Sequence, residues 1–257
     1  MSEDEWDGAI IRTLSDEWAD RLIFFPECGS TNDEAQKLAS KGAENLSVVL
    51  TETQTAGRGR RGQPWACPSG EGIACSVIVR PNEEPALWSR IALATGLAVA
   101  EALDSFGCSP GVKWPNDVWV NQKKVCGILV EAGAGFVVIG MGINVNVTRF
   151  PEDLAFPATS LALEVGTPVS REDVLVACLD RLRVRVGQIG GLFPELLKSW
   201  ETRCVLRGKE VSLISGEKTW SGVVEGISPQ GELILKTSEG IEKFLQASEI
   251  RIVGEET

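Results

Sequence analysis

The densest group of residues suited to chemistry lies at 56–65, "AGRGRRGQPW", where three arginines are interspersed with three glycines. Glycines let a backbone fold closely around an anion and present its N–H groups. Arginines add charge-assisted, bidentate hydrogen bonds to phosphate or carboxylate oxygens. The stretch also satisfies G-x-G-x-x-G, but a dinucleotide fold needs a helix after the glycines, and "QPWACPSGEG" follows instead. The sequence favours an anion-binding loop, and a solvated basic turn is the alternative.

Two later stretches carry polar residues at informative places. In "KWPND" (113–117), Pro115 cannot donate a backbone hydrogen bond, so the strand must bend or lie at an edge, with Lys113 fixed before the bend. A lysine there can meet a phosphate, but the stretch taken alone slightly favours a solvent-facing lysine on an edge strand. In "GMGINVN" (140–146), glycines inside a strand indicate close approach by a ligand, with Asn144 near a base or ribose. A bulge with ordinary strand asparagines is the alternative.

Composition narrows the classes of function. The 257 residues contain no histidine, which excludes a Ser-His-Asp triad, a Cys-His dyad and histidine metal ligands. The net charge of −11 argues against general affinity for nucleic acid. The seven cysteines are widely spaced without a C-x-x-C pair, so reduced thiols are expected. No apolar run reaches the ~18 residues of a membrane span, and the acidic start lacks a secretory basic region, so we expect a cytoplasmic protein.

The periodicity along the chain predicts an α+β protein. Thr31 and Glu34 have capping-box spacing at the start of a helix that Gly42 can end. A long apolar helix is predicted at 86–107, and a β-hairpin turns at 121–123. Further strands are predicted at 46–53, 72–80 and 136–147, and helices within 171–190 and 194–203. From about residue 206, short strands separated by turns resemble a small β-barrel appended to an α+β domain.

The ordered set of stretches resembles the biotin–protein ligases. The match comprises Ser30-Thr31-Asn32, Gln54 with "AGRGRRG", Trp65, "KWPNDVWV", "KVCGILVE" and "GMGINVN", and it covers roughly residues 22–200. The resemblance implies a class II aminoacyl-tRNA synthetase-like mixed or antiparallel sheet flanked by helices. It also implies a catalytic domain at 1–205 and a C-terminal SH3-like β-barrel domain at 206–257.

The implied activity is that of a ligase that uses ATP and biotin as substrates together with Mg²⁺. In the family, the carboxylate of biotin attacks the α-phosphate of ATP, giving biotinyl-5′-AMP and pyrophosphate. A specific lysine of a biotin carboxyl carrier protein, from acetyl-CoA carboxylase or a related carboxylase, then takes the biotinyl group and releases AMP. The resemblance assigns no protein ligand to the metal.

The family's functional positions carry over residue by residue. Arg60 and Lys113 take the catalytic roles. The biotin contacts fall on Ser30, Thr31, Asn32, Gln54, Arg58, Gly59, Arg60 and Lys113. The nucleotide contacts fall on Arg58, Arg60, Lys113 and Asn144. The second step needs a neutral amine although a free lysine has a pKa near ~10.4, and Asp117 is a weak candidate for the group that removes its proton.

The sequence fits three other classes of protein less well. Lipoate–protein ligases share the chemistry, but their Arg-Arg-x-x-Gly-Gly-Gly motif and a histidine-bearing stretch are missing. A biotin or nucleotide sensor could lose Arg58, Arg60 and Lys113, yet all three are present. A nucleic-acid module conflicts with the acidic charge. About twenty residues precede the match, too few for a helix-turn-helix domain, so no DNA binding is expected. The apolar strand "VCGILVEA" could pair two copies through a sheet edge into a homodimer.

Overall fold

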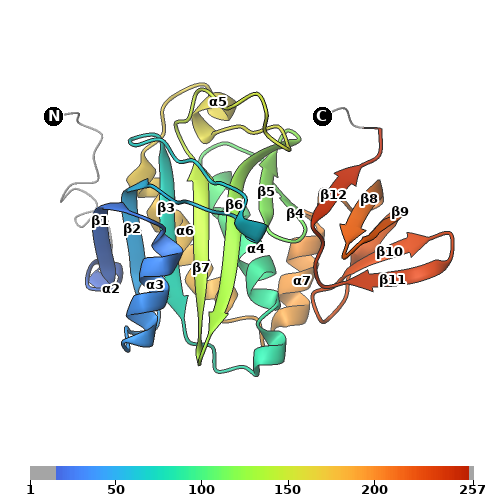
Figure 1. The fold of residues 1–257 in the computed structure, drawn as a ribbon, viewed down its shortest axis with the longest axis horizontal. Coiled ribbons are helices and arrows are strands. Elements are labelled where there is room, and N and C mark those ends of the chain that lie inside the picture. Colours follow the sequence, from blue (N-terminus) through green and yellow to red (C-terminus); the bar gives the residue numbers. More distant parts are fainter. Residues whose placement is uncertain (1–15, 255–257) are drawn as a thin grey trace.

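The computed structural model describes residues 16–254, and it consists of two sheets with helices around the larger one (Figure 1). The expectations about the acidic start and the segment before the match fall mainly on residues 1–15, outside the described part. The larger sheet has the strand order β1-β2-β3-β7-β6-β5-β4, with β1 parallel to β2 and the other neighbours antiparallel. Its strands are β1 (Leu22–Cys28), β2 (Val48–Gln54), β3 (Gly72–Val79), β4 (Gly111–Lys113), β5 (Asp117–Val120), β6 (Lys123–Gly133) and β7 (Phe136–Asn144).

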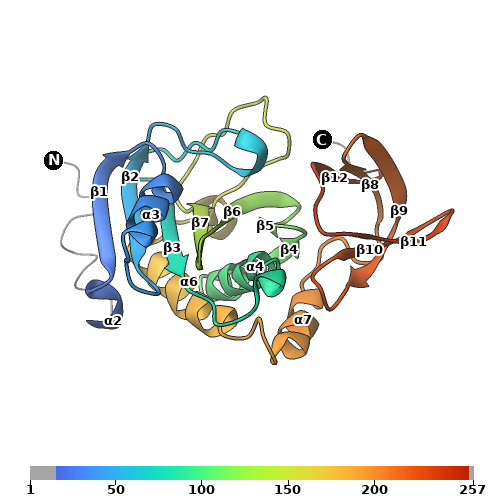
Figure 2. The ribbon, with the colours of Figure 1, turned by 60° about the horizontal axis from the view of Figure 1, so that its bottom comes forward.

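Helices cover both faces of this sheet. One face is covered by helix α3 and by the segment between β2 and β3, and the other face is covered by α4 and α6 (Figure 2). The apolar helix predicted at 86–107 is α4, whose residues from Ile91 to Leu103 are almost all buried. The helices are α2 (Asp16–Ala19), α3 (Thr31–Ser40), α4 (Arg90–Asp104), α5 (Leu161–Val165), α6 (Arg171–Val186) and α7 (Phe193–Glu201), with 3-10 turns at Arg60–Gly62 and Pro85–Leu87. No helix in residues 16–254 is long and apolar enough to cross a membrane.

Alternation along β7 gives the sheet two different faces. Ile139, Met141 and Ile143 point into the core that α4 and α6 share, whereas Gly140 and Gly142 point toward α3 and the segment after β2. Successive side chains of a strand point to opposite faces, so this division follows directly from the sequence. We call the two sides the helix face and the site face.

The predicted hairpin is confirmed. Asn121 and Gln122 link β5 to β6 with φ angles of 47° and 64°, the left-handed values of a tight hairpin turn. The bend predicted at Pro115 is also confirmed, because the run divides there into β4 and β5, which pair with each other, and β4 is an edge strand. Lys113 is the last residue of β4 and lies opposite Asp117.

The capping box predicted at the start of α3 is wrong. Ser30, not Thr31, is the N-cap residue, and its side chain makes no capping hydrogen bond. Glu34 pairs instead with Lys37, at 2.8 Å. The expectation that Gly42 ends the helix is confirmed, because Gly42 follows the C-cap Lys41 with a left-handed φ of 94° and its N–H donates to Ala39 O at 3.1 Å. Thr31 is instead the first helical residue, which turns its side chain into the protein rather than along the helix end.

The C-terminal strands form an antiparallel sheet of order β11-β10-β9-β8-β12. Its strands are β8 (Glu210–Ser215), β9 (Lys218–Ile227), β10 (Leu233–Thr237), β11 (Gly240–Phe244) and β12 (Glu249–Ile252). The stretch "KFLQASEIRIV", predicted as one strand, is divided between β11 and β12 by residues 245–248. The sequence reading also missed β1, α2 and α5, which are short or lack a clear polar–apolar alternation.

Candidate active site

A continuous hydrogen-bond network joins the start of α3 to the site face. Thr31 donates through its backbone N and its Oγ1 to Gln54 Oε1, at 2.8 and 3.1 Å. Ser76 of β3 lies between the helix residues, with its Oγ 2.8 Å from Thr31 Oγ1 and 2.6 Å from Asn32 Oδ1. Ser30, Thr31 and Asn32 are all buried. The structure therefore brings four of the predicted biotin contacts together, and it adds Ser76, which the motifs did not point to.

Glycines in β7 make room for side chains of the protein itself. A Cβ at Gly140 would overlap Asn32 Oδ1, and one at Gly142 would overlap the indole ring of Trp65. The facing Gly127 of β6 lies under the same ring, 3.0 Å from an added Cβ to Trp65 Cζ3. Asn32 and Trp65 therefore approach the strand closely at these two glycines. The Trp65 Nε1 group is buried and has no hydrogen-bond partner among the described residues.

The segment between β2 and β3, residues 55–71, is the arginine loop. It crosses the site face in front of β7 and β6 (Figure 1). Arg58 forms a forked pair with Asp33 of α3, at 2.8 and 2.7 Å, and lies 3.3 Å from both oxygens of Glu131 on β6. The hydrogen bond to Asp33 raises the pKa of Arg58, and the same bond lowers the pKa of Asp33. Gly59 donates its backbone N–H to Gln63 O at 2.7 Å, so it closes the loop turn.

Arg60 connects the arginine loop to both sheets. Its Nη1 donates to Asn116 Oδ1 in the turn between β4 and β5 at 3.2 Å, and its Nη2 donates to the backbone O of Ala247, in the segment between β11 and β12, at 2.9 Å. Burial lowers its pKa, although a guanidinium remains charged at neutral pH. Arg58 and Arg60 are therefore anchored by side-chain contacts, whereas Arg61 is exposed, so a solvated basic turn describes Arg61 alone among the three arginines.

Lys113 is only 4% exposed, so a solvent-facing edge lysine is wrong for this residue. Its Nζ lies 3.9 Å from the ring centroid of Trp119 and 4.0 Å from that of Phe156, two cation–π contacts. A second lysine, Lys124, is part of the same region and was not predicted. Its Nζ lies 2.8 Å from Asp117 Oδ1 and 5.5 Å from the Trp65 ring centroid. The predicted hairpin could have indicated this position, because pairing of its two strands places Lys124 opposite Trp119.

Asn144 lies further along the site face of β7. It is 6% exposed, and its Nδ2 donates to the backbone O of Thr159 at 3.0 Å. The predicted residues thus form two groups with Trp65 between them. One surrounds α3 and Gln54, and the other surrounds the "KWPND" turn with Arg60 and Lys113. Asn144 belongs to neither group by direct contact in the structure.

The cysteines are free thiols, and the described residues show no preformed metal cluster. All seven cysteines are free, and burial raises the pKa of Cys67 to about 12 and that of Cys204 to about 11, so both are protonated at neutral pH. Among residues 16–254 no group of three or more Cys, Asp or Glu side chains is arranged to hold a metal ion.

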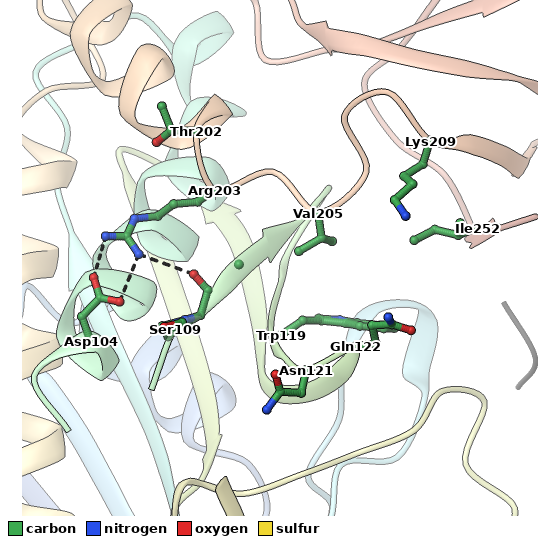
Figure 3. A pocket seen from close by; sticks show the side chains of 12 residues that line it. Asp104, Ser109, Trp119, Asn121, Gln122, Thr202, Arg203, Val205, Lys209 and Ile252 are labelled. Carbon is green, nitrogen blue, oxygen red and sulfur yellow. Dashed lines mark hydrogen bonds and ion pairs between the residues drawn. The ribbon is translucent and has the colours of Figure 1, made fainter. Parts of the chain in front are cut away.

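A separate cavity of about 490 Å³ lies between the β4–β5 edge and the C-terminal sheet (Figure 3). Trp119, Val205, Lys209 and Ile252 line it, and Arg203 is bonded to Asp104 at its rim. None of the predicted biotin or nucleotide contacts lines this cavity. The predicted contacts instead lie on the site face, where Asn32 and Trp65 fill the space above the glycines.

Comparison with known proteins first defines a class. Residues 25–147 match the Biotin/lipoate A/B protein ligase family, and residues 207–248 match the Biotin protein ligase C terminal domain. The fold agrees with that class, because it resembles the biotin protein ligase from Aquifex aeolicus in complex with biotin and ATP. That likeness has a TM-score of 0.80 and 31% identity, and it covers 90% of this chain and 99% of the other.

Curated relatives narrow the class. A Biotin--[acetyl-CoA-carboxylase] ligase from Mycobacterium tuberculosis is 37% identical over 84% of this chain and 83% of the relative. One from Paracoccus denitrificans is 34% identical over 86% of this chain and 96% of the relative. The chain belongs to the biotin protein ligase family. Its mixed α+β sheet flanked by helices and its C-terminal antiparallel sheet are those of a biotin protein ligase-like fold.

Proposed function

We propose that this chain attaches biotin to one lysine of the biotin carboxyl carrier of acetyl-CoA carboxylase or a related carboxylase, using ATP and passing through biotinyl-5′-AMP. Family membership supports the ATP-dependent attachment of biotin. The observation that carries the assignment of the site is the hydrogen-bond network on the site face. It holds Thr31, Asn32 and Gln54 together next to the arginine loop.

The network is suited to the ring system of biotin. A ureido group offers one carbonyl and two N–H groups, and short hydroxyl and amide side chains can bind it in an enclosed pocket. Gln54 uses its Oε1 to accept two hydrogen bonds from Thr31, which directs its NH₂ group away from α3. We assign Ser30, Thr31, Asn32, Gln54, Arg58 and Gly59 to biotin on this basis.

The second group is suited to the reacting anions. A carboxylate and a triphosphate must approach each other, so cations are needed to offset their repulsion and to stabilise charge developing at phosphorus. We assign Arg60 and Lys113 to this catalytic role and add Lys124, which lies in the same region. Asn144 and Arg58 are the remaining proposed nucleotide contacts. Mg²⁺ would accompany the triphosphate, as it does in most nucleotide sites, and would neutralise part of its charge.

The arginine loop would act as a lid. Its contacts on α3, on the "KWPND" turn and on the C-terminal sheet enclose the site face, and enclosure protects a mixed anhydride from water. Asp117 is held at 2.8 Å by Lys124, so we propose that it positions this lysine rather than removing a proton from the acceptor amine.

The finer architecture and the partners are also proposals. We propose a class II aminoacyl-tRNA synthetase-like catalytic domain at 1–205 and an SH3-like barrel at 206–257. The end of α7 at Glu201 and the five-stranded order of the second sheet support this division. Residues 129–133 of β6 pair with β7 on one side only among the described residues, which supports a homodimer through that edge. We propose the cytoplasm as its location.

Incubation with biotin, ATP, Mg²⁺ and a biotin carrier domain tests the proposed function. Mass spectrometry should show one biotin on one lysine of the carrier, with no transfer when ATP is omitted. Lipoate and octanoate serve as matched substrates. A mass shift with either of them but none with biotin would refute the proposal.

A further inference from the structure

Glu131 on β6 contacts both halves of the candidate biotin site. One of its oxygens accepts a hydrogen bond from Asn32 Nδ2 at 2.7 Å, and both lie 3.3 Å from Arg58 Nη2. Asn32 is a buried residue of α3, whereas Arg58 belongs to the arginine loop. A single carboxylate therefore joins the wall of the pocket to its lid.

The carboxylate also determines how the network is oriented. Ionised carboxylates and backbone carbonyls only accept hydrogen bonds, so Asn32 presents its NH₂ group to Glu131 at 2.7 Å and more weakly to Leu129 O at 3.4 Å, and its Oδ1 to Ser76. The single hydroxyl proton of Ser76 is then directed to Asn32 Oδ1, at 2.6 Å. At the other end, the Thr31 backbone N–H can only donate, and this fixes Gln54 Oε1. These two ends fix Asn32, Ser76 and Gln54, and the one hydroxyl proton of Thr31 is shared between two acceptors, Ser76 Oγ and Gln54 Oε1.

Asp33 provides an internal comparison, because it binds the same arginine without joining Asn32. Its forked pair with Arg58, at 2.8 and 2.7 Å, is shorter than the contacts of Glu131. No side-chain hydrogen bond between Asp33 and the pocket amides is present among the described residues. Removing the Asp33 carboxylate thus affects the contact with Arg58 alone, whereas removing the Glu131 carboxylate affects both that contact and the orientation of Asn32.

We infer that Glu131 is a positioning residue that couples closure of the arginine loop over biotin to the orientation of Asn32 in the biotin pocket. This inference rests on the proposed function. Glu131 lies on strand β6 and Asn32 on helix α3, whereas Arg58 lies in the arginine loop outside regular secondary structure, so Arg58 is the one of the three that a loop movement would displace. Biotin that orders the network would favour the closed loop, and a closed loop would in turn hold Asn32 in its binding orientation.

Glu131→Gln and Asp33→Asn test the coupling, with Asp104→Asn as a control because Asp104 pairs with Arg203 outside the site. In the ligand-free enzyme, amide exchange of residues 57–65 should rise about tenfold in both site variants, the factor expected for loss of a charge-assisted hydrogen bond. Biotin affinity, measured by calorimetry, should fall about tenfold in Glu131→Gln and by a smaller factor in Asp33→Asn, which loosens the loop but keeps the hydrogen bond between Glu131 and Asn32. The control should match the wild type in both measurements.

Turnover gives a second, independent readout. Glu131→Gln should raise KM for biotin more than it lowers kcat, and it should increase labelling of bystander lysines. Glu131→Asp, which keeps the charge but shortens the side chain, should show the same two effects and serves where the Gln variant does not fold. A Glu131→Gln enzyme that binds biotin like the wild type, or behaves like Asp33→Asn, overturns the coupling. A wild-type enzyme that transfers no biotin refutes the proposed function instead.

Discussion

The two faces of β7 lie on one strand, yet they carry different properties. Toward α4 and α6 the strand presents large apolar side chains that fill the core, and toward α3 it presents glycines and Asn144. The helix face contributes stability through burial, whereas the site face leaves space that polar side chains and the arginine loop enter. Because alternate residues of β7 point to opposite faces, a substitution on one face should affect stability and a substitution on the other should affect the reaction.

The largest expected effect comes from the helix face. Leu97 of α4 is fully buried, and Leu97→Ala should lower the free energy of unfolding by about 2–5 kcal/mol through the cavity that it leaves. The rate of carrier labelling should be unchanged at temperatures where the variant is folded. Urea unfolding and labelling kinetics measure the two quantities, and a marked loss of rate in the folded variant would show that the faces are not separable.

On the site face, Lys113→Ala should reduce the rate of adenylate formation by about 10²–10³-fold, because it removes a cation at the reacting phosphate. Release of pyrophosphate reports this step. Val112→Ala, the adjacent residue that points into the core, is the matched control and should lower stability without a comparable loss of rate. Equal rates in the two variants would contradict the role of Lys113.

Gly142→Ala should reduce carrier labelling by about tenfold or more, because the added Cβ overlaps the Trp65 ring and displaces the residues that it positions. Met141→Leu, one residue earlier and on the helix face, conserves volume and should leave the rate unchanged. Labelling time courses of both variants compare the two faces at neighbouring residues. A fully active Gly142→Ala enzyme would mean that Trp65 does not need its position on the glycines.

Arg60→Gly should leave adenylate formation in place but let the intermediate escape, since it removes the contacts with Asn116 and Ala247. Labelling of bystander lysines in free solution should rise several-fold, as mass spectrometry of an added unrelated protein would show. If neither leakage nor weaker binding of biotin is seen, the arginine loop is not a lid.

The smallest effect expected is that of pH on the contact between the arginine loop and α3. Arg58 lowers the pKa of Asp33 below its ordinary value of 3.8. Because the folded-state pKa is depressed, the contribution to stability is present above pH 3.8 and is lost as pH falls through the folded-state pKa. Near neutral pH, amide exchange of the loop should be faster in Asp33→Asn than in the wild type, and this difference should disappear only in strong acid. Equal exchange rates of the two proteins near neutral pH would contradict the pairing.

Sequence patterns predicted the long apolar helix, the hairpin at 121–123 and the bend at Pro115 because each rests on local rules of periodicity and turn chemistry. The hydrogen-bond network could not be predicted in this way. Ser76 and Glu131 enter it through strand register and through the position of α3 on the sheet, and both are separated from Asn32 by tens of residues. Lys124 was within reach of the hairpin prediction, but its pairing with Asp117 depends on a register shift between β5 and β6.

The glycines of β7 also show what a local sequence pattern can and cannot predict. Their spacing predicts that something approaches the strand closely, and the structure identifies Asn32 and Trp65 as the groups that do so. A strand pattern specifies which face a glycine is on, but not which distant side chain fills the space above it, because packing across the sheet decides that.

The sequence by itself determined the kinds of residue, their order and the family to which the chain belongs. Arginines beside glycines, a lysine before Pro115 and an absence of histidine already favoured a site built from cations and amides. Only the tertiary structure decided that Arg58 is held by Asp33 and Glu131 and that Arg60 reaches the C-terminal sheet. The physical reason is that hydrogen bonds and ion pairs act over a few ångströms, and only folding brings residues so distant in the chain within that range.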